Sequence, residues 1–246
     1  MTEVKVRFLG SGDAFGSGGR FQTCIAVQWQ EGHILIDCGA SSLIAMKRSG
    51  VDPTTIDAVA VSHLHGDHFA GLPFLVLDQQ FARRTRALVV AGPPGLRARV
   101  LQAMDVLFPG SSTAERTFAV EFVELRARDP TAVGPATVTS YEVRHPSGAP
   151  AYALRVAAGG RLVAYTGDTE WTEVLAEVAR EADVLISEAY FFDRTVKYHL
   201  SYTTLRRHLS ELDAQRIVLT HMSADMLAHR TAVSEQMAED GLALLL

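Results

Sequence analysis

The segment His63-Leu64-His65-Gly66-Asp67-His68 constrains this chain more than any other, because four of its six side chains can bind a metal ion. In a regular strand, alternate residues point to opposite faces, so four ligands this close together require a turn. The apolar segment Ala58-Val59-Ala60-Val61-Ser62 comes just before and predicts a buried strand, whose end would carry that turn. Histidine and carboxylate together suit zinc, and also iron or manganese.

Composition limits the class of protein that can carry this segment. The chain has 246 residues, 48% of them hydrophobic, which is enough for one large domain spanning residues 1–246. A formal net charge of -5 argues against a general nucleic-acid binder, because such proteins usually carry a basic surface. The two cysteines make no disulfide framework, and no apolar run suggests a signal peptide or a membrane span. We therefore expect a cytoplasmic protein without a membrane segment.

The order of the predicted elements favours a layered α/β sandwich over a doubly wound sheet, because strands dominate the first half and helices occur throughout. The glycine-rich segment 10–19 predicts a flexible turn near the site. A phosphate cradle is the alternative, although the lysine of a P-loop is missing. His33 lies in a turn between two predicted strands, and we expect it to face solvent.

Further polar residues share one context with the cluster, because each follows an apolar segment that predicts a strand. His145, Asp168 and His221 occur in this position. With the four residues of the cluster, they make up the set of about seven ligands that a two-metal site needs. Asp37 also follows a predicted strand, where it is either a helix cap or a support for the metal site.

Glu188 and His199 form a second candidate pair. Glu188 ends a predicted strand, and His199 lies eleven residues later. A glutamate bonded to a histidine fixes the tautomer of the ring and favours its protonated form. The alternative is an ordinary ion pair on the surface.

Together, these residues resemble the motifs of the metallo-β-lactamase superfamily along nearly the whole length of the chain. The motifs that carry the resemblance are Asp37, His63-x-His65-x-Asp67-His68, His145, Asp168 and His221, in the order of the family. The resemblance implies a single-domain, four-layer αββα sandwich with two divalent metal ions at the sheet edge. The ligand types favour zinc for these two ions, with manganese or iron as alternatives. The resemblance also implies one metal held by His63, His65 and His145, a second held by Asp67, His68 and His221, and Asp168 as the bridge.

Within the superfamily, the chain is most similar to ribonuclease Z and its phosphodiesterase relatives. Phe8–Gly12, Ile36–Gly39 and the pair Glu188 and His199 carry this resemblance. Ribonuclease Z has a long arm between the third and fourth motifs that grips transfer RNA. Here only 23 residues lead from His145 to Asp168, which is room for little more than a hairpin. The resemblance therefore implies phosphodiester chemistry but disfavours transfer RNA, and the lack of a metal-binding cysteine disfavours β-lactam hydrolysis.

These features predict a hydrolase acting on a small or cyclic phosphodiester. Two metals would make hydroxide available, Asp67 would bind one metal and orient that hydroxide, and His199, held by Glu188, would protonate the leaving alkoxide. The alternatives are an RNA-processing nuclease, an ester, thioester or lactone hydrolase, and a non-catalytic metal-binding carrier of the kind seen in quinone-cofactor biosynthesis. The apolar residues Phe74–Leu77 and Phe81 favour a homodimer, unless another layer of the same chain covers them.

Overall fold

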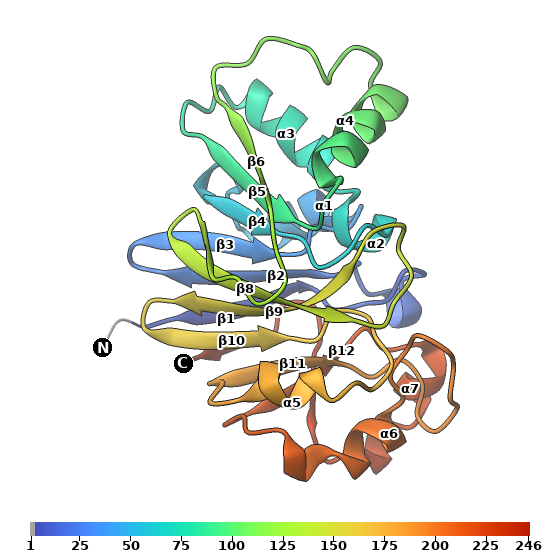
Figure 1. The fold of residues 1–246 in the computed structure, drawn as a ribbon. Helices are drawn as coiled ribbons and strands as arrows, with labels where there is room; N and C mark the ends of the chain where they lie inside the picture. The colour runs from blue at the N-terminus through green and yellow to red at the C-terminus, as the bar shows by residue number, and fades with distance from the viewer. Residues whose placement is uncertain (1–2) are drawn as a thin grey trace.

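Two seven-stranded sheets form the centre of the molecule in the computed structural model, which describes residues 3–246 (Figure 1). The first sheet contains, in spatial order, β14 (Ala243–Leu245), β1 (Lys5–Gly10), β2 (Cys24–Trp29), β3 (Gly32–Ile36), β4 (Ala58–Ala60), β5 (Leu88–Gly92) and β6 (Val120–Glu124). The second contains β13 (Gln236–Met237), β12 (Ile217–Thr220), β11 (Val184–Glu188), β10 (Arg161–Tyr165), β9 (Ala151–Ala158), β8 (Ala136–Val143) and β7 (Thr131–Val133).

Both sheets are mixed in the same way. Strands β3 to β6 run parallel in the first sheet, and β10 to β13 run parallel in the second. The remaining neighbours are antiparallel, among them the hairpin of β9 and β10. Because parallel strands need crossover connections, each parallel half is linked by helices that lie on the outer face of its own sheet.

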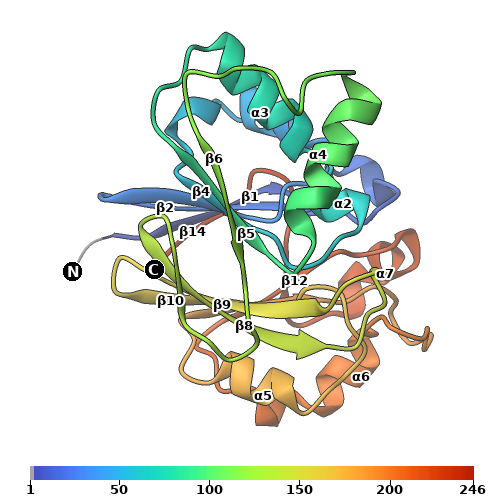
Figure 2. The ribbon, with the colours of Figure 1, turned by 45° about the horizontal axis from the view of Figure 1, so that its top comes forward.

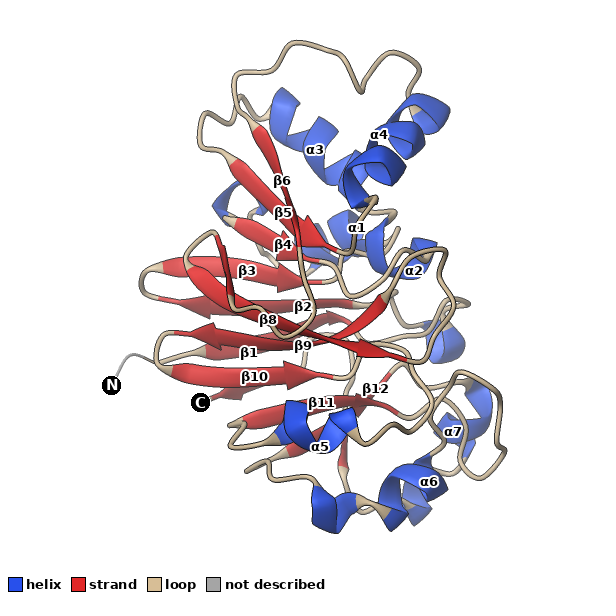
Figure 3. Ribbon diagram, in the orientation of Figure 1, coloured by secondary structure: helices blue, strands red, loops and turns tan. Residues whose placement is uncertain are grey.

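Helices cover both outer faces of the pair of sheets (Figures 2 and 3). Those on the first sheet are α1 (Ser42–Arg48), α3 (Leu72–Phe81) and α4 (Leu96–Leu107), and those on the second are α5 (Val174–Ala179), α6 (Tyr202–Arg207) and α7 (Ala224–Ala228). A single turn, α2 (Gly66–Phe69), lies at one end of the sandwich, away from the two termini. The expected four-layer αββα sandwich is therefore confirmed.

Three apolar clusters hold these layers together. The central cluster lies between the sheets and takes side chains from both, such as Ile25 and Ile36 from the first and Leu154 and Ile186 from the second. The other two clusters lie between each sheet and its helices. The strands in the middle are buried on both faces, which explains why they are continuous apolar runs in the sequence.

The structure differs from the sequence-based expectation in a few short elements. The histidine cluster occupies a loop that runs into the first turn of α2, so its second half is helical. The helix α6 ends at Arg207, and the chain continues as a 3-10 turn, Leu209–Glu211. The strands β7, β13 and β14 have only two or three residues each, too few for a periodic pattern. Short elements depend on pairing with neighbours that a single sequence does not reveal.

The expectation that His33 faces solvent is wrong. Its side chain is buried, and its Nδ1 lies 2.9 Å from the hydroxyl of Thr55 in the 3-10 turn Pro53–Thr55. Burial lowers the pKa of His33, which keeps the ring neutral in this structural role. Among residues 3–246, no helix has the length and apolar character that a membrane crossing requires.

Candidate metal centre

Polar residues from both sheets meet at the end of the sandwich where α2 lies (Figure 1). The carboxyl ends of parallel strands face the same edge of a sheet, which is where α/β proteins place their ligands. In the first sheet, Asp37 follows β3 and the histidine cluster follows β4. In the second, Asp168 follows β10, Glu188 ends β11 and His221 follows β12. The fold thus brings together residues that are up to 184 positions apart in the chain.

The first group of possible ligands consists of three histidines. One ring nitrogen from each of His63, His65 and His145 lies within 4.8 Å of the other two. His145 Nε2 lies 3.0 Å from His65 Nδ1. Burial lowers the pKa of His63 and of His65, and repulsion from neighbouring histidines lowers both further. These two rings are therefore neutral, which is the form that binds a metal ion.

The second group is fully buried and contains both carboxylates: Asp67, His68, Asp168 and His221. Asp67 Oδ2 lies 3.2 Å from His68 Nε2 and 3.2 Å from His221 Nε2. Burial by itself raises the pKa of Asp168, but His221 and His68 outweigh it and hold that pKa well below its usual range. Burial likewise opposes the charge on His221, yet Asp168 and Asp67 raise its pKa to about 10. The ionised carboxylates of Asp67 and Asp168 thus stabilise positive charge in this group, either as a proton on His221 or as a bound cation that replaces it.

Asp168 lies between the two groups. Its carboxylate oxygens are 3.4 Å from His68 Nε2 and 3.4 Å from His221 Nε2. The same carboxylate is 3.9 Å from His63 Nε2 and 4.0 Å from His145 Nε2. One side chain therefore reaches both groups, which is the arrangement that a bridging ligand requires.

Several atoms at this centre are buried and have no hydrogen-bond partner among residues 3–246. They include Nε2 of His63, Nε2 of His68 and Oδ1 of Asp168. A buried polar atom left unpaired costs about 1–3 kcal/mol, so such atoms are uncommon unless a ligand satisfies them. Imidazole nitrogens and carboxylate oxygens are the usual ligands of zinc and related metals. The residues therefore fit a pair of divalent metal ions.

Asp37 is not a helix cap: it bonds to His68 and Ser62 on the side of these residues that faces away from the centre. Its carboxylate accepts hydrogen bonds from Ser62 N at 2.7 Å, from Ser62 Oγ at 2.8 Å and from His68 Nδ1 at 2.7 Å. Ser62 Oγ in turn lies 3.0 Å from His63 Nδ1. These contacts fix the rings of His63 and His68 so that the Nε2 atoms point to the centre.

Replacing Asp37 with asparagine is expected to weaken metal binding by about 10- to 100-fold while the fold is kept. The residue has a positive φ of 57°, a conformation that asparagine tolerates, and its size is unchanged. The amide loses the charge and one of the acceptors that hold His68. Competition against a chelator measures the affinity, with Asp52→Asn as the control because Asp52 only caps a 3-10 turn on the surface. Unchanged affinity in Asp37→Asn would show that His68 needs no such support.

Glu188 and His199 meet as expected from the sequence. His199 Nδ1 lies 2.5 Å from Glu188 Oε1, and the other carboxylate oxygen accepts hydrogen bonds from Thr169 N at 2.9 Å and Leu200 N at 3.2 Å. Burial alone would lower the pKa of His199, but the hydrogen bond and the charge of Glu188 raise it above 6.5. The ring is partly exposed, which leaves it accessible to a substrate.

The structure adds a contact that the sequence did not indicate. Glu188 Oε1 also lies 3.6 Å from His221 Nδ1, so this glutamate touches the second group as well as His199. Asp168, Glu188, His199 and His221 accordingly form a further set that lies within metal-binding distance. His199 offers Nδ1 to Glu188 at hydrogen-bond distance, which leaves its Nε2 available for another partner.

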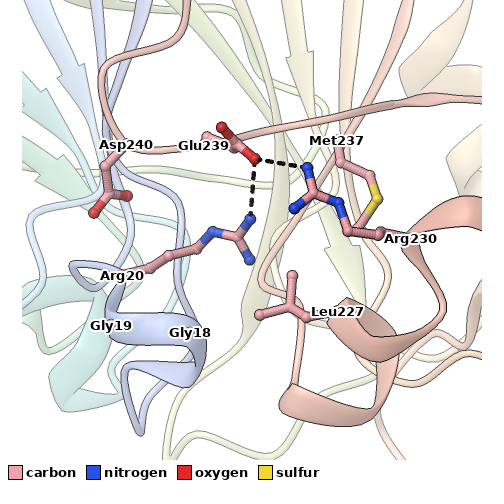
Figure 4. A pocket seen from close by; sticks show the side chains of 8 residues that line it. All are labelled: Gly18, Gly19, Arg20, Leu227, Arg230, Met237, Glu239 and Asp240. Carbon is pink, nitrogen blue, oxygen red and sulfur yellow. Dashed lines mark hydrogen bonds and ion pairs between the residues drawn. The ribbon is translucent and has the colours of Figure 1, made fainter.

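The glycine-rich segment 10–19 lies beside this centre and wraps around a buried carboxylate. Asp13 accepts hydrogen bonds from Phe15 N, Ser17 N and Ser17 Oγ at 2.8–3.2 Å. On the other side of the segment is a pocket of about 390 Å³, in which Arg20 and Arg230 both face Glu239 (Figure 4). None of the residues that line this pocket belongs to the metal-capable groups.

Two residues of the site had no signal in the sequence. His145 Nδ1 donates a hydrogen bond to the carbonyl oxygen of Tyr198 at 3.0 Å, which leaves Nε2 free to face His65. Any residue type supplies a carbonyl group, so the sequence could not point to Tyr198. Tyr190 stacks on His199 and is visible in the sequence only as one aromatic residue in a loop of several.

Comparison with known proteins gives a matching family model, relatives in sequence and solved structures of the same fold. The sequence model of the family described as "Anti-Pycsar protein Apyc1" matches residues 4–240. Ribonuclease Z of Agathobacter rectalis is 35% identical over 126 residues, which are 51% of this chain and 40% of that relative. Ribonuclease Z of Lachnoclostridium phytofermentans is 31% identical over 161 residues, and the chain spans 51% of it. The chain thus spans about half the length of these two relatives.

A third relative and several solved structures cover at least 96% of the chain. Ribonuclease Z of Haloferax volcanii is 27% identical over 291 aligned positions, which include 96% of this chain and 90% of that relative. The metallo-β-lactamase fold protein YhfI from Bacillus subtilis has a TM-score of 0.81 at 23% identity, with both chains fully covered. A diphosphatase of the PhnP family has a TM-score of 0.78 at 21% identity and 98% and 97% coverage. Zinc-bound PqqB from Methylobacterium extorquens has a TM-score of 0.74 at 20% identity, covering 98% and 100%.

Proposed function

Because this chain belongs to the family of the anti-Pycsar protein Apyc1, has the metallo-β-lactamase fold and is related to ribonuclease Z, we propose that it is a metal-dependent phosphodiesterase. Its substrate is a small or cyclic phosphodiester. The observation that carries this proposal is the pairing of the two ligand groups, which share Asp168, with a separate proton donor, His199, held by Glu188. Hydrolysis of a phosphodiester needs both a nucleophile at neutral pH and a proton for the leaving alkoxide.

The residues divide the chemistry between them. The groups centred on His63, His65 and His145 and on Asp67, His68 and His221 would hold one metal ion each, with Asp168 shared. When bound, the metals supply hydroxide at neutral pH and offset the negative charge of the phosphoryl oxygens. Asp67 orients the nucleophile from its place beside His68 and His221. His199 donates its Nε2 proton to the departing alkoxide while Glu188 stabilises the charged ring.

A small substrate fits this chain better than transfer RNA. Between His145 and Asp168 the chain forms only the hairpin β9–β10, so it has no long arm at the position expected for ribonuclease Z. The alignment with the Haloferax volcanii relative is longer than this whole chain, which means that the relative carries residues without a counterpart here. The net charge of -5 also opposes a polyanion.

A substrate screen tests the proposal against its alternatives. We expect the metal-loaded protein to hydrolyse bis-p-nitrophenyl phosphate and at least one member of a panel of cyclic nucleotides and cyclic sugar phosphates. Cleavage of a precursor transfer RNA in preference to the small diesters would identify an RNA-processing nuclease. Turnover of esters, thioesters or lactones alone would identify a carboxylic ester hydrolase. Binding of metal without turnover of any of these substrates would identify a metal-binding carrier.

We propose two zinc ions per chain, with manganese or iron as the alternatives. Histidine dominates both ligand groups, and neutral imidazole with carboxylate is a typical zinc environment. The zinc-bound PqqB structure has the same fold, which supports the choice. Elemental analysis of protein purified without chelator gives the identity and the number of the metal ions.

We propose that the protein is a homodimer. The same chain covers part of α3, because Leu75 and Val76 are buried against the first sheet and Phe74 packs edge-on against Phe108, at the end of the neighbouring helix α4, at 5.4 Å between ring centroids. Phe81 nevertheless stays 81% exposed, and Val106 on α4 is 75% exposed. A contact between copies would remove these two side chains from water, which supports the dimer.

Light scattering at micromolar concentration should therefore give twice the monomer mass, and Phe81→Ser should lower it. Phe15→Ser is the matched control, since Phe15 is 84% exposed but lies on the glycine-rich segment and not on α3. A monomer mass for the unmodified protein would exclude the dimer.

We also propose that residues 1–246 work as one domain in the cytoplasm. The central apolar cluster contains Val4 and Leu244, residues near the two ends of the chain, which supports one cooperative unit. Cys24 and Cys38 are buried free thiols, as is usual in a reducing compartment. A single unfolding transition and recovery in the cytoplasmic fraction are the expected results.

A further inference from the structure

Tyr190 lies at the junction of the two segments that carry His199 and His221. Its backbone N–H donates to the carbonyl of Leu200 at 2.8 Å, and its own carbonyl accepts from Ser223 N at 3.0 Å. These two bonds tie Tyr190 to the residue after His199 and to the residue two positions after His221. The main chain of Tyr190 is therefore fixed relative to both histidines, and so is the position from which its side chain extends.

The ring of Tyr190 covers one face of His199. The two ring centroids are 4.7 Å apart, with planes inclined by 30°. The ring of His145 approaches His199 edge-on, at 4.9 Å and 74°. The imidazole of His199 therefore has three contacts: Glu188 at Nδ1, Tyr190 on one face, and His145 in an edge-on arrangement. Its Nε2 is left to face the substrate.

The hydrogen bond to Glu188 cannot orient the imidazole alone. The second side-chain torsion of histidine has a broad energy minimum, so a ring anchored at Nδ1 can still tilt and swing Nε2 away from the leaving group. A flat aromatic face stacked on the imidazole restricts this tilt. Proton transfer depends steeply on such alignment, because a displacement of about 1 Å can cost roughly 10²-fold in rate.

We propose that Tyr190 is a positioning residue that holds the plane of His199 for proton donation to the leaving group. The inference rests on the proposed function, in which His199 is the proton donor. It assigns the effect to the ring of Tyr190, whose observed contact with His199 is the stacking of the two rings, and not to the hydroxyl.

Two variants separate the ring from the hydroxyl. Tyr190→Phe keeps the flat ring and should stay within about 3-fold of the unmodified enzyme on every substrate. Tyr190→Leu keeps an apolar side chain but removes the flat face, and it should lower kcat roughly 10- to 10²-fold on a 3′,5′-cyclic nucleotide, whose ribose alkoxide needs the proton. KM should hardly change, and the loss on bis-p-nitrophenyl phosphate should be under about 3-fold, because p-nitrophenolate leaves without the proton.

Phe192→Leu is the matched control. Phe192 stacks on His229 at 4.4 Å and 10°, in the same loop but on a histidine outside the proposed centre. It should show no preference between the two leaving groups. Melting temperature and metal content identify a variant that is merely unstable, and Tyr190→Met replaces Tyr190→Leu in that case.

The decisive measurement is the double variant Tyr190→Leu/His199→Ala. If Tyr190 acts through His199, the double variant should be no slower than His199→Ala alone. An additional loss in that background, or equal losses on both substrates, would overturn the proposal. A loss in Tyr190→Phe as large as that in Tyr190→Leu would overturn it in favour of a direct contact by the hydroxyl. Absence of any leaving-group dependence in His199→Ala itself would instead refute the proposed function.

Discussion

Replacement of Asp168 by alanine is expected to remove both metal ions and to lower phosphodiester hydrolysis by about 10³-fold or more. Loss of a single preorganised electrostatic contact already costs roughly 10²- to 10³-fold in enzymes, and this change disturbs two metal sites. Among residues 3–246, Asp168 is the one carboxylate that lies within 4.0 Å of histidines from both groups, namely His63 and His145 on one side and His68 and His221 on the other.

The metal content of Asp168→Ala distinguishes a bridge from an ordinary ligand. Elemental analysis and chelator competition should show that both affinities fall together. Asp13→Ala is a useful comparison, because Asp13 is also a buried carboxylate near the site but bonds only to its own loop. It should keep both ions. If Asp168→Ala loses one ion while the other stays at full affinity, the bridging role is wrong.

Replacement of His199 by alanine is expected to cost roughly 10²- to 10⁴-fold on a substrate with a poor alkoxide leaving group, such as a ribose hydroxyl. The same variant should lose much less on a p-nitrophenyl ester, because p-nitrophenolate needs no proton to depart. Metal content should stay nearly unchanged. Comparison of kcat on the two substrates, together with elemental analysis, measures the effect.

The pH profile gives an independent view of the same residue. Glu188 raises the pKa of His199 above its ordinary value of 6.5, so the ring stays protonated to higher pH than a free histidine. The rate on the poor leaving group should fall as pH rises through that raised pKa, and His199→Ala should abolish this limb of the profile. Equal losses on both leaving groups would show that His199 positions the substrate, and loss of metal would show that it is a ligand.

Glu188→Gln is less selective than the sequence suggested. The sequence alone predicts a weaker version of the His199→Ala pattern, through the tautomer and charge of that ring. The structure places Glu188 Oε1 3.6 Å from His221 Nδ1 as well. The variant is therefore expected to weaken metal binding together with the leaving-group effect, and its kinetic data need the metal content beside them.

The residues of the candidate metal centre could be predicted from the sequence because each follows a recognisable local pattern. His145, Asp168 and His221 each follow an apolar strand, and the cluster His63–His68 packs four ligands into one turn. The carboxyl ends of parallel strands in an α/β fold lie at the same edge of the sheet. Polar residues at these strand ends therefore lie close to one another, even when many residues separate them in the chain. The layered fold followed from the same alternation of buried strands and helices.

Short strands, and contacts between residues far apart in the sequence, could not be predicted from local sequence patterns. The strands β13 and β14 owe their existence to pairing with β12 and β1, and His33 is buried because Thr55 bonds to its ring. The carbonyl of Tyr198, which orients His145, has no side-chain signature. Such contacts form between segments far apart in sequence. Their stability depends on which partner the fold brings close, and the type of one residue does not reveal that partner.

The sequence by itself determined which reactive side chains the fold can bring together: the candidate ligands around His63–His68, the pair Glu188 and His199, and the strands that present them. Only the tertiary structure decided how these parts are coupled. It placed Asp168 between two histidine groups, set Glu188 against both His199 and His221, and stacked Tyr190 on the proposed proton donor. The reason is physical: residue type and spacing fix what a side chain can bind, whereas distances of 3–5 Å between strand ends depend on how the two sheets pack.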